Sequence, residues 1–440
     1  MLTLLALCLA TEAAPKARKV VEDVPDPRLA ALPNLQILNV PTYDGSGQAV
    51  HPDVAYFRDG YRGHFFYMAV TPYPLGNSAF ENPSVLVSEN GVDWREEVAG
   101  LNPMVPTPPS DHNDDPDLSW NPATQEFLLH YLETRRFPFA GAFQDVKLLR
   151  SPDGVSWQLS TALHYDLVAG DPFILSPALV RKGNASFLFY VNASTAPYRI
   201  EYLESPDGRT WDKKAIHLPV ANFPRGFTPW HVDVFGDGRG WYYMLCNGYT
   251  GVDFYDGHDL YLARSQDLTT WEVCQDPILK TGRDLSDARC VYRSTGVVDP
   301  VGGLLAVWFS YPTPQEIWKV GVAKFKLADR FPVAVTPVTA PTAPNLYSVW
   351  TSMRMGQTGQ YAARDAWDPD AGTTLTYTFD WGDGSSLTPV GPTNQFGPGI
   401  GVGPYHTWTA PGTWFIRCKV TDNTGLSSPW SAPLVVTVSP

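Results

Sequence analysis

One turn phrase recurs along the first 271 residues of the chain: Ser-x-Asp or Ser-x-Asn, then Gly in three of the four copies, then Trp three residues later. The copies end at Trp94, Trp157, Trp211 and Trp271. These tryptophans are 63, 54 and 60 residues apart, close to the length of one four-stranded blade of a β-propeller with its loops. The repeat therefore constrains this part of the chain to a ring of similar β-sheets.

The phrase has the residue types of a tight turn. An Asp or Asn side chain can hydrogen-bond its own backbone, and glycine accepts a positive φ without strain. The Trp then begins the next strand and is expected to pack between neighbouring blades. The fourth copy carries Leu268 where the others have glycine, so a different turn is predicted there.

Segments of alternating apolar residues precede each turn, as expected for half-buried β-strands. A fifth unit without the Trp turn follows the fourth copy. The predicted strands are 65–70, 84–87, 126–132, 146–149, 186–191, 199–203, 240–246 and 260–263, with 289–292, 304–310 and 317–325 in the fifth unit. The sequence thus predicts five blades over residues 41–330.

The composition changes after the fifth unit. Prolines crowd residues 331–344, which is typical of an extended linker. Residues 345–440 then hold short predicted strands at 375–381, 403–408, 413–422 and 433–438. The predicted fold class is all-β, a five-bladed β-propeller followed by an Ig-like β-sandwich. With 36 glycines, 41 prolines and only 18% charged residues, the chain does not have the composition of a helical bundle.

Charge and hydropathy exclude two classes of partner. A net charge of −13 repels a phosphate backbone, so no nucleic-acid partner is expected. No apolar stretch reaches the roughly 18 residues of a membrane span. Residues 1–40 are interpreted as a signal segment or as an arm retained in an assembly, because residues 1–14 contain a short apolar run and small residues but no preceding Lys or Arg.

Five cysteines, an odd number without a C-x-x-C pair, predict neither a zinc site nor a disulfide framework. Buried free thiols are expected. Any disulfide would join two of Cys246, Cys274 and Cys290, a choice that the sequence leaves open.

Acidic and histidine residues repeat where the inner strands are expected to begin. His51 and Asp53 are two residues apart and so face the same side of a strand. The same spacing recurs in the second and fourth units, and Arg289 and Arg293 lie in the fifth. The candidate catalytic residues are Asp53, Asp117 and Asp233, and the candidate substrate-binding residues are His51, Asp115, Trp230, His231 and Arg293.

The two histidines invite a metal interpretation. No H-x-H or H-x-x-E-H spacing supports it, so hydrogen-bonded histidines are favoured, no cofactor is predicted, and a structural cation such as calcium is the alternative. Aromatic side chains that could stack on sugar rings, or pack between blades, are Tyr73, Phe80, Trp120, Trp230, Tyr249 and Tyr311.

The phrase Tyr377-Thr-Phe-Asp-Trp-Gly-Asp-Gly384, followed by His406-Thr-Trp408 and Val420-Thr-Asp-Asn-Thr-Gly425, resembles the PKD family of Ig-like modules. The resemblance covers residues 345–440. It implies a spacer or an appendage that contacts proteins or glycans in an extracellular or surface setting. Asp380 and Asp383 are expected to stabilise the turn rather than to bind a cation.

The blade openings His51-Pro-Asp-Val54, Asp115-Pro-Asp-Leu118 and Leu175-Ser-Pro-Ala-Leu179 resemble the five-bladed propellers of glycoside hydrolase family 43. The longer phrases at 51–57, 68–74 and 81–84 are similar to hydrolase-like propellers of bacterial secreted proteins and of tailed-phage structural proteins.

The family resemblance implies that Asp53 is a catalytic base and that Asp117 tunes the pKa of an acid in the third blade. This chain departs from the family at that acid, because Ser176 replaces the expected Glu and a hydroxyl cannot act as a general acid near neutral pH. The residues that would have to replace it are Glu81, Glu201, Glu204 or Asp233.

Two functions follow from these observations. The favoured one is a glycan-binding structural or adhesion protein, secreted or on a virion surface, because the catalytic set is incomplete. The alternative is an active glycoside hydrolase that uses Asp53 and Asp117. The expected partners are a glycan or polysaccharide and, through the N-terminal arm and the PKD-like module, other virion or cell-surface proteins.

Overall fold

The structure is a computed structural model that divides into two compact units, Met1–Pro332 and Val333–Pro440. The candidate signal segment at residues 1–14 and linker residues 332–338 lie outside the described residues. The residues that the structure describes are 24–108, 111–135, 141–218, 223–224, 226–251, 254–255, 257–274, 276–331, 339–369, 373–394 and 401–440.

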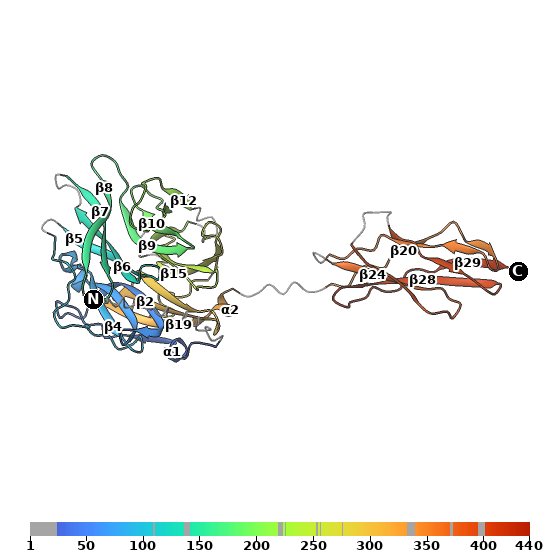
Figure 1. Cartoon of the computed structure of the whole chain (residues 1–440), viewed down its shortest axis with the longest axis horizontal. Coiled ribbons are helices and arrows are strands. Elements are labelled where there is room, and N and C mark those ends of the chain that lie inside the picture. The colour runs from blue at the N-terminus through green and yellow to red at the C-terminus, as the bar shows by residue number, and fades with distance from the viewer. Residues whose placement is uncertain are drawn as a thin grey trace, which may run out of the picture. The chain divides into compact units, whose positions relative to one another are not determined.

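The first unit is a ring of five antiparallel sheets, as the repeat predicted (Figure 1). In four of the five sheets the strands follow one another in chain order outward from the axis, and the five innermost strands contact their neighbours around the ring. The blades consist of β2 (Ala49–Tyr61), β3 (His64–Pro72) and β4 (Ser84–Ser88); β5 (His112–Asn121), β6 (Glu126–Arg135), β7 (Phe143–Ser151) and β8 (Gln158–Asp166); β9 (Ile174–Lys182), β10 (Ala185–Asn192), β11 (Arg199–Ser205) and β12 (Ile216–Leu218); β13 (Thr228–Gly236), β14 (Tyr242–Tyr249), β15 (Asp259–Ser265) and β16 (Glu272–Val273); and β17 (Ser294–Asp299), β18 (Leu304–Pro312) and β19 (Trp318–Lys326).

The ring is closed by a strand from the N-terminal side. Strand β1 (Leu35–Ile37) pairs antiparallel with β19 and so becomes the outer strand of the fifth blade. The short helix α1 (Pro27–Ala31) precedes β1, and its N-cap Asp26 donates its backbone N–H to the carboxylate of Asp299 in β17 at 2.8 Å. First and last segments of the propeller are therefore tied together, and the fifth blade gains a short outer strand.

All four copies of the Trp turn adopt the same conformation. In the second copy, the Ser151 hydroxyl accepts the N–H groups of Asp153 and Gly154 at 3.2 and 2.8 Å. The prediction of a different turn at Leu268 is wrong, because Leu268 has φ +71° beside +77° for Gly154 and its N–H is also accepted by a serine hydroxyl. Leu268 is fully buried between the third and fourth blades, and that burial offsets roughly 1–2 kcal/mol of left-handed strain.

The predicted strand at residues 289–292 of the fifth unit is wrong. Residues 289–292 form no strand, and the inner strand of the fifth blade is β17, which starts at Ser294. The short elements outside the sheets are two 3-10 turns, Pro74–Gly76 and Ser78–Phe80, and helix α2 (Leu327–Arg330), which ends the propeller.

The second unit is a small β-sandwich around a core of buried aromatic rings. Tyr361 packs edge-on against Trp381 and Trp408, with ring centroids 5.6 and 5.4 Å away. The four predicted strands are present, and the short strands between them were not predicted. Its sheets are β20 (Asn345–Tyr347), β23 (Ala362–Arg364) and β26 (Gly401–Val402); β21 (Ser352–Arg354), β29 (Leu434–Ser439), β28 (Gly412–Asp422), β24 (Thr374–Asp380) and β25 (Thr388–Asn394); and β22 (Thr358–Gln360) with β27 (Tyr405–Thr407).

The Trp-Gly-Asp-Gly phrase of this sandwich is a hydrogen-bonded turn. The Asp380 carboxylate accepts the Gly382 N–H at 3.0 Å, and that of Asp383 accepts the Ser385 N–H at 3.0 Å. The ring of His406 pairs with Asp383 at 2.8 Å. Both aspartates therefore have the turn-stabilising contacts that the sequence led us to expect.

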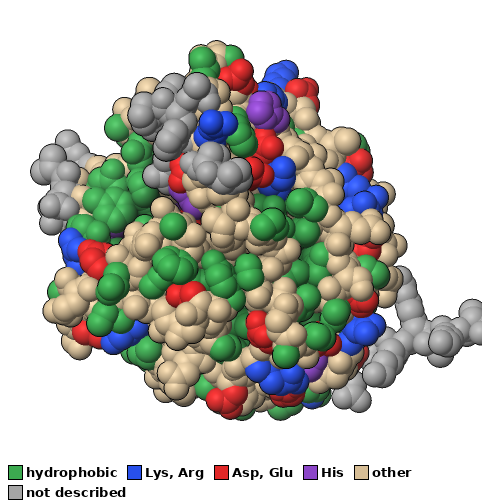
Figure 2. Space-filling view, turned by 90° about the vertical axis from the view of Figure 1, so that its left-hand side faces the viewer, with side chains coloured by type: hydrophobic (Ala, Val, Ile, Leu, Met, Phe, Trp, Pro, Cys, Tyr) green, Lys and Arg blue, Asp and Glu red, His purple; other side chains and the backbone are tan. Residues whose placement is uncertain are grey.

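The four cysteines among the described residues, Cys246, Cys274, Cys290 and Cys418, are buried free thiols. No helix in the described part of the chain is long and apolar enough to cross a membrane. On the face that Figure 2 shows, most Lys and Arg side chains lie toward the margin, whereas hydrophobic and neutral side chains occupy much of the centre.

Candidate functional site

The inner strands of the first three blades begin with an unusual backbone. His51, Asp115 and Ser176 have φ values of +56°, +50° and +56°, and a proline follows each of them. The pairing register of each strand slips by one residue at this point, so each motif is a β-bulge. A bulge re-aims a side chain and tolerates a proline, which has no N–H for the ladder. The x-Pro motifs therefore turn their side chains into the central channel.

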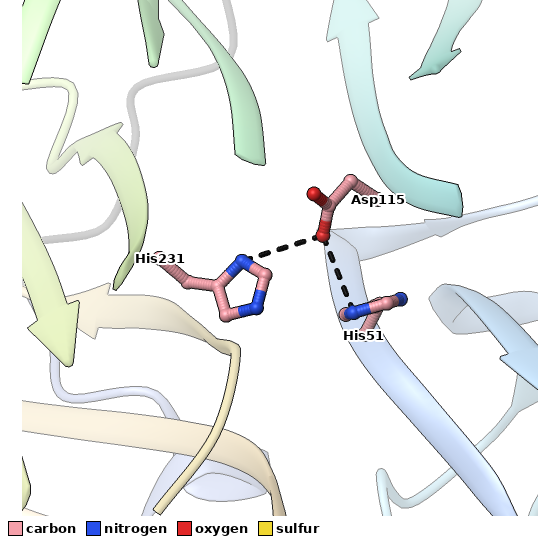
Figure 3. A group of neighbouring side chains, drawn as sticks. All are labelled: His51, Asp115 and His231. Atoms are coloured by element: carbon pink, nitrogen blue, oxygen red, sulfur yellow. Dashed lines mark ion pairs between the residues drawn. The ribbon is translucent and has the colours of Figure 1, made fainter. Parts of the chain in front are cut away.

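Two of these side chains, His51 and Asp115, form one layer with His231 of β13, which we call the histidine layer (Figure 3). The Asp115 Oδ1 atom lies 3.3 Å from His51 Nε2 and 3.4 Å from His231 Nδ1. All three side chains are buried, with 1–4% exposure. Among the described residues, neither Asp115 Oδ1 nor either ring nitrogen of His231 has a hydrogen-bond partner.

Burial sets the charge of this layer. Loss of hydration lowers the pKa of His51 and of His231, so both imidazoles are neutral at pH 7. Burial alone would raise the pKa of Asp115, but His231 and His51 in their protonated forms, the Arg293 guanidinium and the Ser176 backbone N–H lower it below its usual range. The layer therefore presents two neutral histidines and one carboxylate to a common centre.

Asp53, Asp117 and Asp233 lie two residues further along their strands and form a second layer, the aspartate layer. One oxygen of each carboxylate lies within 4.8 Å of one oxygen of each of the others. Both oxygens of Asp117 accept the Leu179 N–H of the next blade at 3.2 Å. Burial and neighbouring carboxylates raise the pKa of Asp117 to about 8, burial raises that of Asp233 to about 6, and that of Asp53 is raised as well.

Arg293 joins the two layers. Its guanidinium is fully buried, with Nη1 3.3 Å from Asp115 Oδ1 and Nη2 3.6 Å from Asp53 Oδ2. Nη2 also donates to the carbonyl of Pro177 at 3.0 Å. Arg289, the other arginine that the sequence offered, lies outside the channel, where it pairs with Glu316 and covers the ring of Tyr255.

Ser176 occupies the third-blade position and connects two blades. Its hydroxyl donates to the Val232 carbonyl at 2.7 Å and accepts the Val232 N–H at 3.2 Å. Its own N–H donates to Asp115 Oδ2 at 2.8 Å. The fully buried serine therefore has a structural role and holds Asp115 in place.

A further group of titratable side chains lies beside the histidine layer. The Glu81 carboxylate lies 3.8 Å from His51 Nδ1 and 4.0 Å from His112 Nε2, and His112 Nε2 lies 3.0 Å from Asp114 Oδ2. All four side chains are buried. His112 is not among the site residues predicted from the sequence, although its position three residues before Asp115, at the start of an inner strand, was a usable signal.

Of the other acids considered from the sequence, Glu201 lies outside the channel, where its carboxylate accepts hydrogen bonds from Tyr190 and Asn192. Trp230, by contrast, lies close to the histidine layer. Its Nε1–H donates to the Tyr292 hydroxyl at 3.1 Å, and the Tyr292 ring lies edge-on to His231, with centroids 4.4 Å apart.

A cavity of about 560 Å³ lies on the other side of the aspartate layer. It is lined by residues that follow that layer along the inner strands, including Trp120, and by the loop after β13, including Trp241. The two ends of the channel therefore differ. The histidine layer lies toward the starts of the inner strands, and the cavity lies toward their ends.

Comparison with known proteins identifies the modules. Residues 340–438 match the family model of the PKD domain, so the C-terminal unit is a PKD domain. The propeller is similar to an A type blood N-acetyl-α-D-galactosamine deacetylase of Flavonifractor plautii, 28% identical over 309 residues. That match covers 60% of this chain, and the chain spans only 40% of the relative's length.

Solved structures show the same fold. A crystal structure of an N-acetylgalactosamine deacetylase from F. plautii, in complex with blood group B trisaccharide, superposes with a TM-score of 0.59 at 23% identity, over 67% of this chain and 95% of that one. A family 43 β-1,3-galactosidase is a further neighbour, with a TM-score of 0.45 and 12% identity over 65% of this chain and 92% of that one. The predicted five-bladed propeller followed by a PKD module is confirmed.

Proposed function

We propose that this protein hydrolyses the acetamido group of an N-acetylated sugar in a glycan, with a divalent cation held by the histidine layer. The observation that carries the proposal is the meeting of His51, Asp115 and His231 from three different blades. Their facing atoms lie 3.3–3.4 Å apart, and those of Asp115 and His231 lack hydrogen-bond partners in the described part of the chain. The activity named for the deacetylase relative supports the same reaction class.

The residues present fit such a cation. Two neutral imidazoles and one carboxylate are a ligand set of catalytic zinc and of related divalent metals, and three protein ligands leave a position for water or substrate. A cation bound there would polarise the amide carbonyl and lower the pKa of a water molecule. Arg293 and the Ser176 N–H keep Asp115 ionised and oriented, as outer contacts of a metal ligand do.

Glu81 and His112 are placed to move protons. Hydrolysis adds water to the carbonyl carbon, breaks the C–N bond and releases acetate and the sugar amine, so one proton leaves the water and one reaches the departing nitrogen. Glu81, 3.8 Å from His51, is the base in this scheme, and His112, 4.0 Å from Glu81, returns a proton to the amine. Neither group is itself one of the three proposed cation ligands.

Hydrolysis of a glycosidic bond is less well supported. An inverting pair needs roughly 6.5–9.5 Å between its carboxyl groups to admit a water molecule. In the aspartate layer one oxygen of each of Asp53, Asp117 and Asp233 lies within 4.8 Å of one oxygen of each of the others. The third-blade acid is absent, and Ser176 is engaged in contacts between blades.

The test is release of acetate from an oligosaccharide that ends in N-acetylgalactosamine. We expect release by the parent protein and its loss on treatment with a strong chelator. Asp115→Asn should lower the rate by about 100-fold or more, because the carboxylate ligand becomes a weakly binding amide. Asp287→Asn, which changes a surface ion pair with Lys319, is the matched control and should keep the parent rate. A parent protein that releases no acetate with any divalent metal added would contradict the proposal.

A second candidate function is a non-catalytic glycan-binding protein outside the cytoplasm, secreted or on a virion surface, with the PKD domain in contact with other surface proteins. It is favoured by the Ser176 substitution and by the attached PKD domain. Binding to immobilised glycans by a parent protein that never changes them would support this candidate over the enzyme.

A further inference from the structure

We infer that the aspartate layer is a second cation site, which takes calcium or a similar hard divalent ion through Asp53, Asp117 and Asp233. It differs from the histidine layer in position and in chemistry. All of its protein ligands are carboxylate oxygens, and carboxylates are the ligands that calcium prefers, whereas imidazoles suit transition metals.

The geometry within the layer supports an ion at its centre. The protein holds part of each carboxylate: the Leu118 N–H bonds that of Asp53, and the Thr295 side chain with the Val234 and Gly296 N–H groups bonds that of Asp233. The second oxygen of each, Oδ2, is buried and has no hydrogen-bond partner among the described residues.

A buried carboxylate oxygen without a donor is costly, by roughly 1–3 kcal/mol or more for a charged group. Here two such atoms belong to the same group of carboxylates from three blades. Asp53 Oδ2 lies 3.6 Å from Arg293 Nη2, beyond hydrogen-bond distance. A cation between the blades would satisfy both.

The charge of the channel points the same way. Four buried carboxylates line it, those of Asp53, Asp115, Asp117 and Asp233, and Arg293 supplies one positive charge. When all four carboxylates are ionised, three negative charges remain uncompensated. A divalent cation in the histidine layer would offset two of these charges, and a cation beside Asp53, Asp117 and Asp233 would offset the rest.

The neighbouring cavity provides a route and the remaining ligands. Calcium binds six to eight oxygens, more than three monodentate aspartates offer. The cavity of about 560 Å³ is lined by the same three aspartates and has room for the waters that would complete the shell. Because Trp120 and Trp241 also line it, a lanthanide substituted at this site can be excited through tryptophan.

The experiment uses the full-length protein after metal removal. The histidine layer is first filled with zinc, and calcium is then titrated by calorimetry and, in parallel, terbium by luminescence excited at the tryptophan band. We expect one calcium per chain and a rise in Tm of roughly 5 °C at saturating calcium. Asp117→Asn and Asp233→Asn should each weaken calcium binding by at least tenfold, whereas His231→Ala should leave it intact.

Asparagine keeps an oxygen that can accept the backbone N–H, so the fold should persist, and circular dichroism checks it. The rise in Tm with calcium is measured on the parent protein, so this part of the test does not depend on whether any variant folds. Asp287→Asn is again the matched surface control. The inference is overturned if calcium neither binds the zinc-loaded parent nor raises its Tm, if the folded aspartate variants bind calcium as the parent does, or if His231→Ala alone removes calcium binding.

The two proposals fail separately. A parent protein that releases acetate but binds no calcium leaves the proposed function standing and removes the second site. A parent protein that binds calcium through Asp117 and Asp233 but releases no acetate does the reverse.

Discussion

At the scale of single residues, the chemistry of the channel depends on which polar groups have partners. Ser176 uses its hydroxyl twice and its N–H once, and so holds a bulge in place. Asp115 and His231, on either side of it, keep atoms free of hydrogen bonds. The same buried setting therefore makes one residue structural and leaves its neighbours able to bind a ligand.

Ser176→Ala is predicted to destabilise the propeller without removing the histidine layer. The change leaves the buried Val232 carbonyl and N–H without their partner, at a cost of about 1–3 kcal/mol in the free energy of unfolding. Urea unfolding measures the loss. Acetate release per folded molecule should remain within a few-fold of the parent, and a variant with parental stability would show that these hydrogen bonds contribute nothing.

The aspartate layer predicts a pH dependence of stability in the metal-free protein. Between pH 6.5 and 8 the folded state keeps a proton on Asp117, whose pKa is raised to about 8, while the unfolded chain has already lost it. The folded state therefore binds more protons, and its free energy of unfolding falls as pH rises through this window. The buried histidines, with lowered pKa values, act below about pH 6.5 and in the opposite direction.

The measurement is urea unfolding in chelator at pH 6.5 and at pH 8. We expect lower stability at pH 8 in the parent protein and a smaller difference in Asp117→Asn, which has no titrating carboxyl at this position. Equal pH differences in the two proteins would exclude Asp117 as the source.

At the scale of elements, the Trp turn is a repeated unit whose sequence varies more than its backbone. Three copies use glycine for the left-handed position, at φ +74°, +77° and +69°, and the fourth uses Leu268 at +71°. The connection between strands thus requires the left-handed conformation in every copy. Packing between blades then decides which residue can occupy that position.

Leu268→Gly is therefore predicted to destabilise the propeller, although glycine is the residue of the other three copies. Relief of roughly 1–2 kcal/mol of left-handed strain is smaller than the roughly 2–5 kcal/mol lost when a buried leucine is removed from a packed core. Urea unfolding should show a net loss of about 2 kcal/mol. An increase in stability would mean that backbone strain, and not burial, dominates at this turn.

At the scale of the whole molecule, the chain consists of two units with separate cores. The propeller closes on itself through β1 and β19, and no described residue of the second unit belongs to any of the propeller sheets. The residues of both proposed cation sites lie in the first unit.

A chain shortened to residues 24–332 is accordingly predicted to fold and to keep both cation sites. Its Tm and its rate of acetate release should match those of the propeller in the full-length protein, because no core or site residue is removed. Calorimetry of the full-length protein should show a separate transition for the PKD domain. Failure of the shortened chain to fold would show that the second unit supports the ring.

The sequence by itself determined the architecture, because a repeated turn, alternating strands and a PKD phrase are local patterns, and each is written in neighbouring residues. It also placed His51, Asp53, Asp115 and Asp117 at the starts of inner strands. The predicted strand at residues 289–292 is wrong. Strand β1 was not predicted, because its three exposed residues carry no pattern and join the ring only by pairing with β19.

Only the tertiary structure decided how the channel residues are grouped. Residues 51, 115 and 231 are separated by long stretches of sequence, and three blades, each with a bulge in its inner strand, bring them to one point. No short H-x-H spacing could reveal such a site, because its spacing is set by the ring. Hydrogen-bond partners likewise come from the neighbouring blade. The structural role of Ser176 and the proposed cation binding by the two layers could therefore be inferred only from the fold.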